Sequence, residues 1–236
     1  MELKFSSFSC QGARPTNQDR LLEPVMMSAG TWIAAIADGV GGASGGAEAA
    51  QFAIETAAAN SGLLPDLDLI FAETVKKIIA FAAADEGLKR MATTLSVIHI
   101  QQATVHVAHV GDTRIYHLRG GGLNTLTRDQ TELAELRRKG ILSEYQARRY
   151  PRKNVLLSAL SPRADYEIYH SEAALESGDR LLLLTDGLYE KLTRQAISDL
   201  SSSNAEVERF ANALRDRAAD LSPTDNFTAV AVEVTY

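Results

Sequence analysis

The chain has 236 residues, of which 45% are hydrophobic and 23% charged, and its formal net charge is -6. This length suits one large domain, and the acidic balance argues against general nucleic-acid binding, which requires a basic surface. The single cysteine, Cys10, excludes an internal disulfide framework and favours a reducing compartment. We expect a cytoplasmic protein without membrane contact, because no secretory signal and no bilayer-spanning apolar run is visible.

The first half of the chain predicts two strands and two helices. Residues 3–9 alternate weakly, as in an edge strand, and residues 32–37 form an apolar run that stops at Asp38. The alanine-rich segment 44–59 predicts a helix that starts just after a glycine cluster. A second helix is predicted over 67–84. Its apolar stripe would consist of Leu69, Ile70, Val75, Ile78, Ile79 and Phe81.

In the middle of the chain the apolar pattern changes from the period of helices to that of strands. Three β-prone runs are expected to form an antiparallel meander; they are 94–100, 104–110 and 113–118. Two short helices are predicted after them, over 132–139 and 143–149, joined at Gly140.

The last third predicts two strands and an amphipathic helix. Four leucines in 180–185 indicate a strand that is buried on both faces, and 206–219 has the pattern of an amphipathic helix. Residues 228–234 alternate, with Val230, Val232 and Val234 on one face and Ala229, Ala231 and Glu233 on the other. Strands cluster and helices come in pairs, which favours an α+β layered fold with antiparallel sheets inside a single domain over residues 1–236.

Four aspartates at the ends of apolar runs carry the strongest functional signal. They are Asp38, Asp112, Asp186 and Asp225; glycine borders three of them and Asn226 the fourth. Carboxylates gathered in one place repel one another unless something positive lies among them, and a pair of hard divalent cations meets that need. The leading hypothesis is therefore a two-metal hydrolytic centre. Taken singly, each segment is also compatible with an ordinary turn.

Further motifs accompany these aspartates in a definite order along the chain. The set comprises Arg14 with 17–19, then 38–42, 91–95, 111–114, 178–188 and 225–228. Together they resemble the metal-dependent protein phosphatases, the type 2C serine/threonine phosphatases, in their compact bacterial form. The resemblance spans nearly the whole chain and implies a four-layer α-β-β-α sandwich, in which two antiparallel sheets are flanked by helix pairs and the metals lie in a cleft at one end.

The resemblance also implies the metal ligands. Asp38 would bridge two cations, Asp186 and Asp225 would complete the first metal site, and the Gly39 carbonyl would serve the second. Asp112, together with Asp186, would hold a third and weaker ion. The cofactor would be Mn²⁺ or Mg²⁺, because the motifs supply oxygen ligands only.

The implied activity is hydrolysis of phosphoserine and phosphothreonine in phosphoproteins, by direct attack of a metal-bridging hydroxide. As catalytic residues, Asp19 would accept hydrogen bonds from metal-bound water and Arg14 would bind the substrate phosphate. The enzyme would act as a monomer and reverse a bacterial Hanks-type Ser/Thr kinase.

Four positions depart from the family pattern. Gln18 replaces the commoner glutamate, Val40 stands where many eukaryotic members have a histidine proposed as general acid, Ala92 replaces a glycine, and Gln130 replaces the histidine of an Asp-His-Ser motif. The last of these lies in the expected flap, at about residues 128–160 beside the cleft.

The flap has four more basic than acidic residues between positions 128 and 153. This excess is compatible with docking of phosphorylated, acidic peptides and equally with two helices that have solvated charged faces.

Two other functions remain compatible with the sequence. A pseudo-phosphatase would bind a partner without turnover, but all four metal aspartates are present. A metal-dependent phosphatase for small metabolites is the other, and the basic flap favours protein substrates only mildly.

Overall fold

The computed structural model describes residues 1–27, 30–40, 44–60, 66–163 and 165–235. Its strands form two antiparallel five-stranded sheets. The order in the first sheet is β1 (Glu2–Cys10), β10 (Phe227–Thr235), β9 (Arg180–Leu184), β6 (Arg114–Arg119) and β7 (Gly122–Thr125). The order in the second sheet is β2 (Asp19–Met26), β3 (Trp32–Asp38), β4 (Leu95–Gln101), β5 (Thr104–Val110) and β8 (Tyr169–Ala174).

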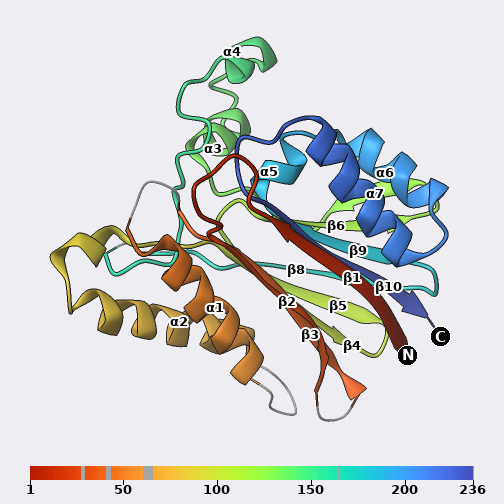
Figure 1. The fold of residues 1–236 in the computed structure, drawn as a ribbon, viewed down its shortest axis with the longest axis horizontal. Coiled ribbons are helices and arrows are strands. Elements are labelled where there is room, and N and C mark those ends of the chain that lie inside the picture. The colour runs from red at the N-terminus through yellow and green to blue at the C-terminus, as the bar shows by residue number, and fades with distance from the viewer. Residues whose placement is uncertain (28–29, 41–43, 61–65, 164, 236) are drawn as a thin grey trace.

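Helices cover the outer faces of both sheets, as Figure 1 shows. α1 (Gly46–Ala59) and α2 (Leu67–Ala82) pack on the second sheet, whereas α6 (Arg194–Ser203) and α7 (Val207–Asp220) pack on the first. A third apolar cluster fills the space between the sheets. The predicted α+β fold with four layers, α-β-β-α, is confirmed.

The last strand shows how the sequence builds these layers. Val230, Val232 and Val234 are fully buried between the two sheets. Ala229 and Ala231 lie on the opposite face, in the core beneath α7, where their small side chains allow the helix to approach. This confirms the predicted alternation, and each buried valine stabilises the fold by roughly 1.5–3 kcal/mol.

The predicted meander is wrong at its third strand. β4 and β5 pair antiparallel from Leu95–Val110 to Gln101–Thr104, as expected. β6 does not continue beside β5, because it pairs with β7 and β9 in the other sheet. The chain crosses between sheets at Gly111, whose φ of +113° disfavours side chains, and an added Cβ would lie 2.5 Å from Thr94 Cγ2. β8 takes the place beside β5 that β6 was expected to fill.

The apolar stripe of α2 also differs from the prediction. Ile70 and Ile78 are buried as expected, but Leu69, Ile79 and Phe81 are 46%, 48% and 38% exposed. The buried face of the helix is completed by other residues, namely Phe71, Thr74 and Ala82. The helical period of apolar residues predicted a wider buried face than the structure has, because the helix contacts its neighbours with one side only.

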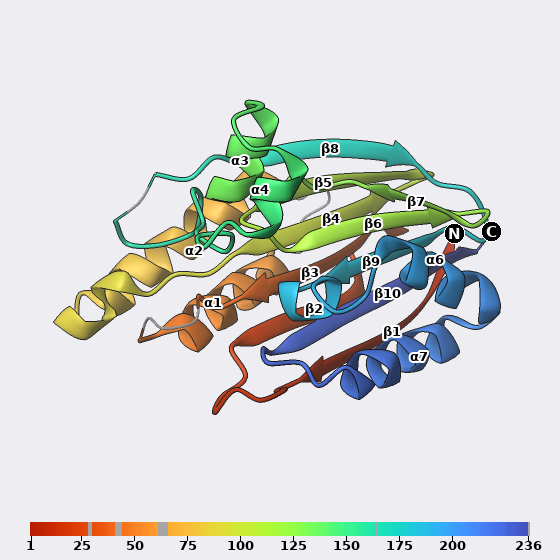
Figure 2. The same ribbon diagram turned by 90° about the horizontal axis from the view of Figure 1, so that it is seen from above.

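The flap lies between β7 and β8. Its two short helices are α3 (Glu132–Arg138) and α4 (Glu144–Arg148), close to the predicted ranges, and they project from one end of the sandwich (Figures 1 and 2). The sequence analysis did not identify β2, β7, β8, α6, the one-turn α5 (Asp186–Tyr189) or the 3₁₀ helix Glu86–Arg90. No helix among the described residues has the length and apolar character needed to cross a membrane.

Candidate metal centre

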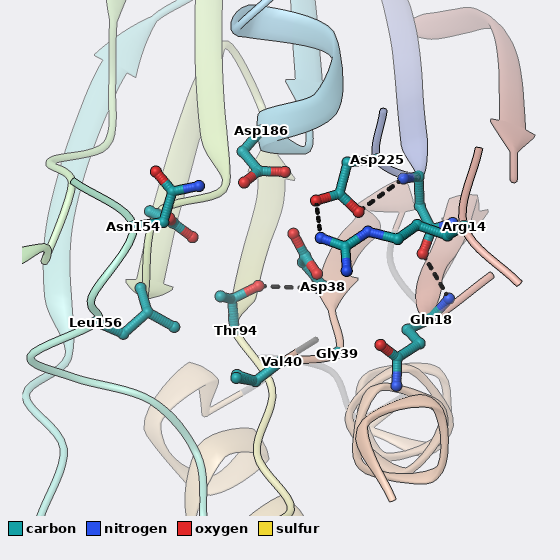
Figure 3. Close-up of a pocket in the computed structure, with 12 residues that line it drawn as sticks. Arg14, Gln18, Asp38, Gly39, Val40, Thr94, Asn154, Leu156, Asp186 and Asp225 are labelled. Atoms are coloured by element: carbon teal, nitrogen blue, oxygen red, sulfur yellow. Dashed lines mark hydrogen bonds and ion pairs between the residues drawn. The ribbon is translucent and has the colours of Figure 1, made fainter. Parts of the chain in front are cut away.

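One pocket at an end of the sandwich collects carboxylates from four distant segments. Asp38, Asp112, Asp186 and Asp225 all line it. Figure 3 shows the site, with Arg14 beside Asp225 and Asp38. The remaining lining residues are Gln18, Gly39, Val40, Thr94, Asn154, Leu156 and Asn226. Residues 41 and 42 of the predicted glycine motif lie outside the described residues.

Strand directions explain why these aspartates meet. β3 and β5 both run antiparallel to β4, so Asp38 at the end of β3 and Asp112 just after β5 lie at the same end of the second sheet. In the first sheet β9 and β10 are antiparallel. Asp186 follows β9 and Asp225 precedes β10, which places both at one end of that sheet as well.

Close backbone packing joins the last two motifs. A Cβ on Gly187 would lie 2.0 Å from the backbone oxygen of Asn226, so only glycine allows the start of α5 to approach the start of β10 this closely. The Asn226 side chain then anchors the loop that contains Arg14. Its amide donates to the carbonyls of Gln11 (2.7 Å) and Thr16 (3.0 Å).

Arg14 supplies positive charge among the carboxylates. Its Nη2 lies 2.6 Å from Oδ2 of Asp225, and Figure 3 shows the guanidinium between Asp225 and Asp38. The hydrogen bond to Asp225, and then the charges of Asp225, Asp186 and Asp38, raise the pKa of Arg14. Within the described residues, no three or more His, Cys, Asp or Glu side chains are already arranged to enclose an ion. Asp225 is engaged by Arg14, so a cation that binds Asp225 would compete with this contact.

Asp38, Asp112 and Asp186 hold their protons unusually strongly, because the pKa of each is raised. Burial, followed by repulsion from Asp112 and Asp225, raises the pKa of Asp186 to about 8. Burial also raises the pKa of Asp112 to about 7, and burial together with the neighbouring carboxylates raises the pKa of Asp38 well above its usual range. Divalent cations can replace such protons. An oxygen-only donor set of this kind fits Mn²⁺ or Mg²⁺.

Asp19 lies behind the pocket and is not one of its lining residues among those the structure describes. It is paired with Asp38 across β2 and β3 and is only 3% exposed. Thr185 Oγ1 donates to its carboxylate at 2.9 Å. Burial raises the pKa of Asp19 to about 6, although bonds from Thr228 and Thr185 oppose the shift. Asp19 thus lies beside Asp38 and is held by Thr185, the residue before Asp186.

The sequence analysis assigned no role to four residues that shape the site. Thr94 Oγ1 accepts a hydrogen bond from the Asp38 amide at 2.9 Å, and Asn226 anchors the Arg14 loop; both belong to recognised motifs, so their positions carried a signal. Asn154 and Leu156 reach the pocket from the flap. No local pattern marks these two, because their role depends on how the flap folds back.

Comparisons with known proteins agree with this geometry. Residues 9–224 match the family model described as protein phosphatase 2C. The serine/threonine phosphatase stp of Listeria innocua is 30% identical over 211 residues, covering 85% of this chain and 84% of that protein. Protein phosphatase PhpP of Streptococcus pneumoniae is 27% identical over 241 residues, which cover 98% of each protein.

A solved structure agrees as well. The catalytic domain of the serine/threonine phosphatase PstP, in complex with two manganese ions, superimposes with a TM-score of 0.86 and 28% identity over 99% of each chain. The family and the fold predicted from the motifs are therefore confirmed. With a family model that covers most of its length, relatives that match it nearly end to end and aspartates that converge on one pocket, the chain belongs to the protein phosphatase 2C family of serine/threonine phosphatases.

Proposed function

We propose that this pocket is the catalytic centre of a metal-dependent phosphatase that removes phosphate from phosphoserine and phosphothreonine in proteins. One observation carries the proposal: four carboxylates from distant segments line a single pocket together with Arg14. Residues 1–236 would act as one phosphatase domain, with the flap at about 128–160 forming a wall of the pocket through Asn154 and Leu156.

The metal ligands would be the aspartates and one backbone carbonyl. Asp38 would lie between two divalent cations, with Asp186 and Asp225 on the first and the Gly39 carbonyl on the second. Asp112 with Asp186 would hold a third. When bound, Mn²⁺ or Mg²⁺ would acidify a water molecule for attack on phosphorus and offset charge on the phosphoryl oxygens.

Arg14 would bind the substrate phosphate. Its side chain is 45% exposed and forms an ion pair with Asp225. The guanidinium can therefore turn toward a ligand in the pocket mouth. A guanidinium presents paired N–H donors that match two phosphate oxygens. Asp19, held by Thr185, would orient the attacking water from behind Asp38. These roles need no nucleophilic side chain on the protein.

Metal removal tests the proposal directly. We expect purified protein to hydrolyse p-nitrophenyl phosphate with Mn²⁺ and to lose this activity in EDTA, because the attacking water is acidified only by the cations. Restoring activity with excess Mn²⁺ is the control for irreversible unfolding. Hydrolysis that continues unchanged in EDTA would exclude a metal-dependent centre.

We further propose phosphoprotein substrates, a Hanks-type Ser/Thr kinase as the opposing enzyme, a cytoplasmic location and a monomeric state. The names of the relatives, which include a protein phosphatase, support the substrate class. The single cysteine supports a reducing compartment.

Ion pairs limit which basic side chains of the flap are available for docking. Five of its eight basic side chains are in ion pairs, which are Arg137–Glu144, Arg138–Glu135, Lys139–Glu135, Arg152–Glu132 and Lys153–Glu190. Among the described residues no ion pair involves the other three, Arg128, Arg148 and Arg149. Arg149 instead lies over the ring of Tyr145, 4.5 Å from its centroid. Two of these three, Arg148 and Arg149, lie at the end of α4, and we propose that docking of acidic peptides uses this pair.

A paired substitution tests docking at α4. We expect R148Q/R149Q to lower kcat/KM for a phosphoprotein about threefold to tenfold, because each lost charge contact costs up to about 1 kcal/mol. Hydrolysis of p-nitrophenyl phosphate, which is too small to reach α4, should be unaffected. R137Q/R138Q is the matched control, since both side chains are already neutralised by glutamates. Equal losses on the two substrates would show that α4 has no docking role.

A further inference from the structure

The backbone of Gly111, directly before Asp112, makes three hydrogen bonds. Its buried N–H donates to Oε1 of Gln130 at 2.8 Å. Its carbonyl accepts from the backbone N–H of Gln130 at 2.8 Å and from Nε2 of His109 at 3.0 Å. With both the N–H and the carbonyl of Gly111 bound, the two peptide groups that flank this residue are fixed, and the turn that presents Asp112 to the pocket has little freedom to rotate.

His109, which makes one of these contacts, is fully buried. Burial lowers the pKa of His109 to about 4, so the ring is neutral at working pH. A carbonyl can only accept, so Nε2 carries the proton and Nδ1 accepts from Ser96 Oγ at 2.7 Å. Ser96 in turn lies 2.7 Å from Thr113 Oγ1. This chain returns to the residue after Asp112 and fixes the turn from its inner side.

Gln130 connects the same turn to the flap. Its side-chain Nε2 donates to the backbone carbonyl of Glu167 at 2.8 Å. Its backbone carbonyl accepts from the N–H of Leu157 at 2.8 Å. Leu157 follows Leu156, which lines the pocket. Gln130 therefore joins the Asp112 turn to two other segments: its side chain links Gly111 to Glu167, and its backbone carbonyl binds the segment by which the flap returns past the site.

A neighbouring ion pair reinforces this connection. Arg114 donates to both carboxylate oxygens of Asp129, at 3.0 and 2.6 Å. The turn and the first residues of the flap are thus joined by two separate sets of bonds, and of these two sets the bonds of Gln130 are the ones that reach the backbone of Gly111, directly before Asp112.

We infer that Gln130 is a positioning residue: by binding the Gly111 N–H its side chain sets the direction of the Asp112 carboxylate, and so the affinity of the pocket for the divalent cation that Asp112 would contact. This inference rests on the proposed metal-dependent function. Gln130 itself touches neither cation nor substrate. Its effect would therefore appear in metal binding and would disappear once metal is saturating.

The test compares three variants by calorimetric titration of metal-free protein with Mn²⁺. Q130M keeps the side-chain length and removes the acceptor, which leaves the Gly111 N–H unpaired. We expect its weakest Mn²⁺-binding step to lose affinity about tenfold, as a lost buried hydrogen bond implies. Its kcat at saturating Mn²⁺ should stay close to that of the wild type. Q130A is the substitute should Q130M not fold.

Two controls separate positioning from general loosening of the flap. Q130E keeps an oxygen for the Gly111 N–H but cannot donate to Glu167, so it should bind Mn²⁺ at least as tightly as the wild type. Q146M removes a capping contact within α4, where Gln146 Oε1 accepts from the Ser143 N–H at 2.9 Å. It disturbs the flap without touching Gly111 and should leave Mn²⁺ binding unchanged.

Three results would overturn the inference: wild-type Mn²⁺ affinity in Q130M, an equal loss in Q130E, or an equal loss in Q146M. A lower kcat in Q130M at saturating Mn²⁺, with unaltered affinity, would also do so, because it would indicate a structural defect. If the wild-type protein bound no Mn²⁺, the proposed function would fail together with this inference. Normal wild-type binding with an insensitive Q130M would overturn the positioning role alone.

Discussion

Replacing Asp186 with asparagine is expected to abolish turnover and at the same time to stabilise the metal-free protein. Burial, and then repulsion from Asp112 and Asp225, raise the pKa of Asp186. The proposed first and third cations both need its carboxylate. Losing this ligand should cost several kcal/mol of transition-state stabilisation, or about a thousandfold in kcat.

The gain in stability has the same electrostatic origin as the loss of activity. Burial among like charges raises the pKa of Asp186 to about 8, so folding at neutral pH requires this group to take up a proton, a cost that a neutral amide of similar shape avoids. We expect the free energy of unfolding of metal-free D186N to exceed that of the wild type by roughly 2 kcal/mol at pH 7.5. For a chain of this size, the melting temperature would rise by about 5 °C.

Two measurements check this pair of effects, namely p-nitrophenyl phosphate turnover with Mn²⁺ and thermal unfolding in EDTA. D220N, at an exposed position at the end of α7, removes the same charge away from the pocket and should change neither. Near-normal turnover of D186N would refute the ligand role, and a lower melting temperature would refute the account of repulsion.

Rising pH is expected to destabilise the metal-free protein and to strengthen Mn²⁺ binding. The carboxyl groups of Asp112 and Asp186 have an ordinary pKa of 3.8, raised in the folded protein to about 7 and about 8. Between pH 4 and these values the folded state keeps protons that the unfolded state has lost. Stability therefore falls as pH rises through this window.

Metal binding has the opposite dependence, because each cation must displace these protons. For each proton released, the apparent affinity rises up to tenfold per pH unit. We expect the apparent Mn²⁺ affinity to increase on the order of a hundredfold between pH 6 and pH 8. The metal-free protein should lose about 2 kcal/mol of stability over the same range.

Calorimetric Mn²⁺ titrations at pH 6, 7 and 8, in two buffers of different ionisation enthalpy, measure both the affinity and the number of protons released. D186N is the control, because it removes a carboxyl group whose pKa is raised to about 8 and should flatten both pH dependences. A metal affinity independent of pH in the wild type would show that the pocket carboxylates are already ionised before metal arrives.

Much of the site could be predicted from the sequence because its signals are local. Asp38 and Asp186 each terminate an apolar run, and a buried strand that ends in a polar, glycine-bordered turn exposes its last side chain at the edge of a sheet. The alternation in 228–234 likewise determined which face of the final strand meets the other sheet. Such periodicities are intrinsic to the backbone geometry of strands and helices, so they survive without knowledge of the fold.

Only the tertiary structure decided which segments meet. The run that became β6 has the same local character whether it pairs with β5 or with β9, and the choice depends on the crossing at Gly111 and on β8, which occupies the other position. The same holds for the Arg14–Asp225 ion pair, which joins residues 211 positions apart, and for the contact of Gln130 with Gly111. Contacts of this kind depend on the packing of the whole sandwich, since the energy that selects them comes from burial and hydrogen bonding between distant segments rather than from the preferences of neighbouring residues.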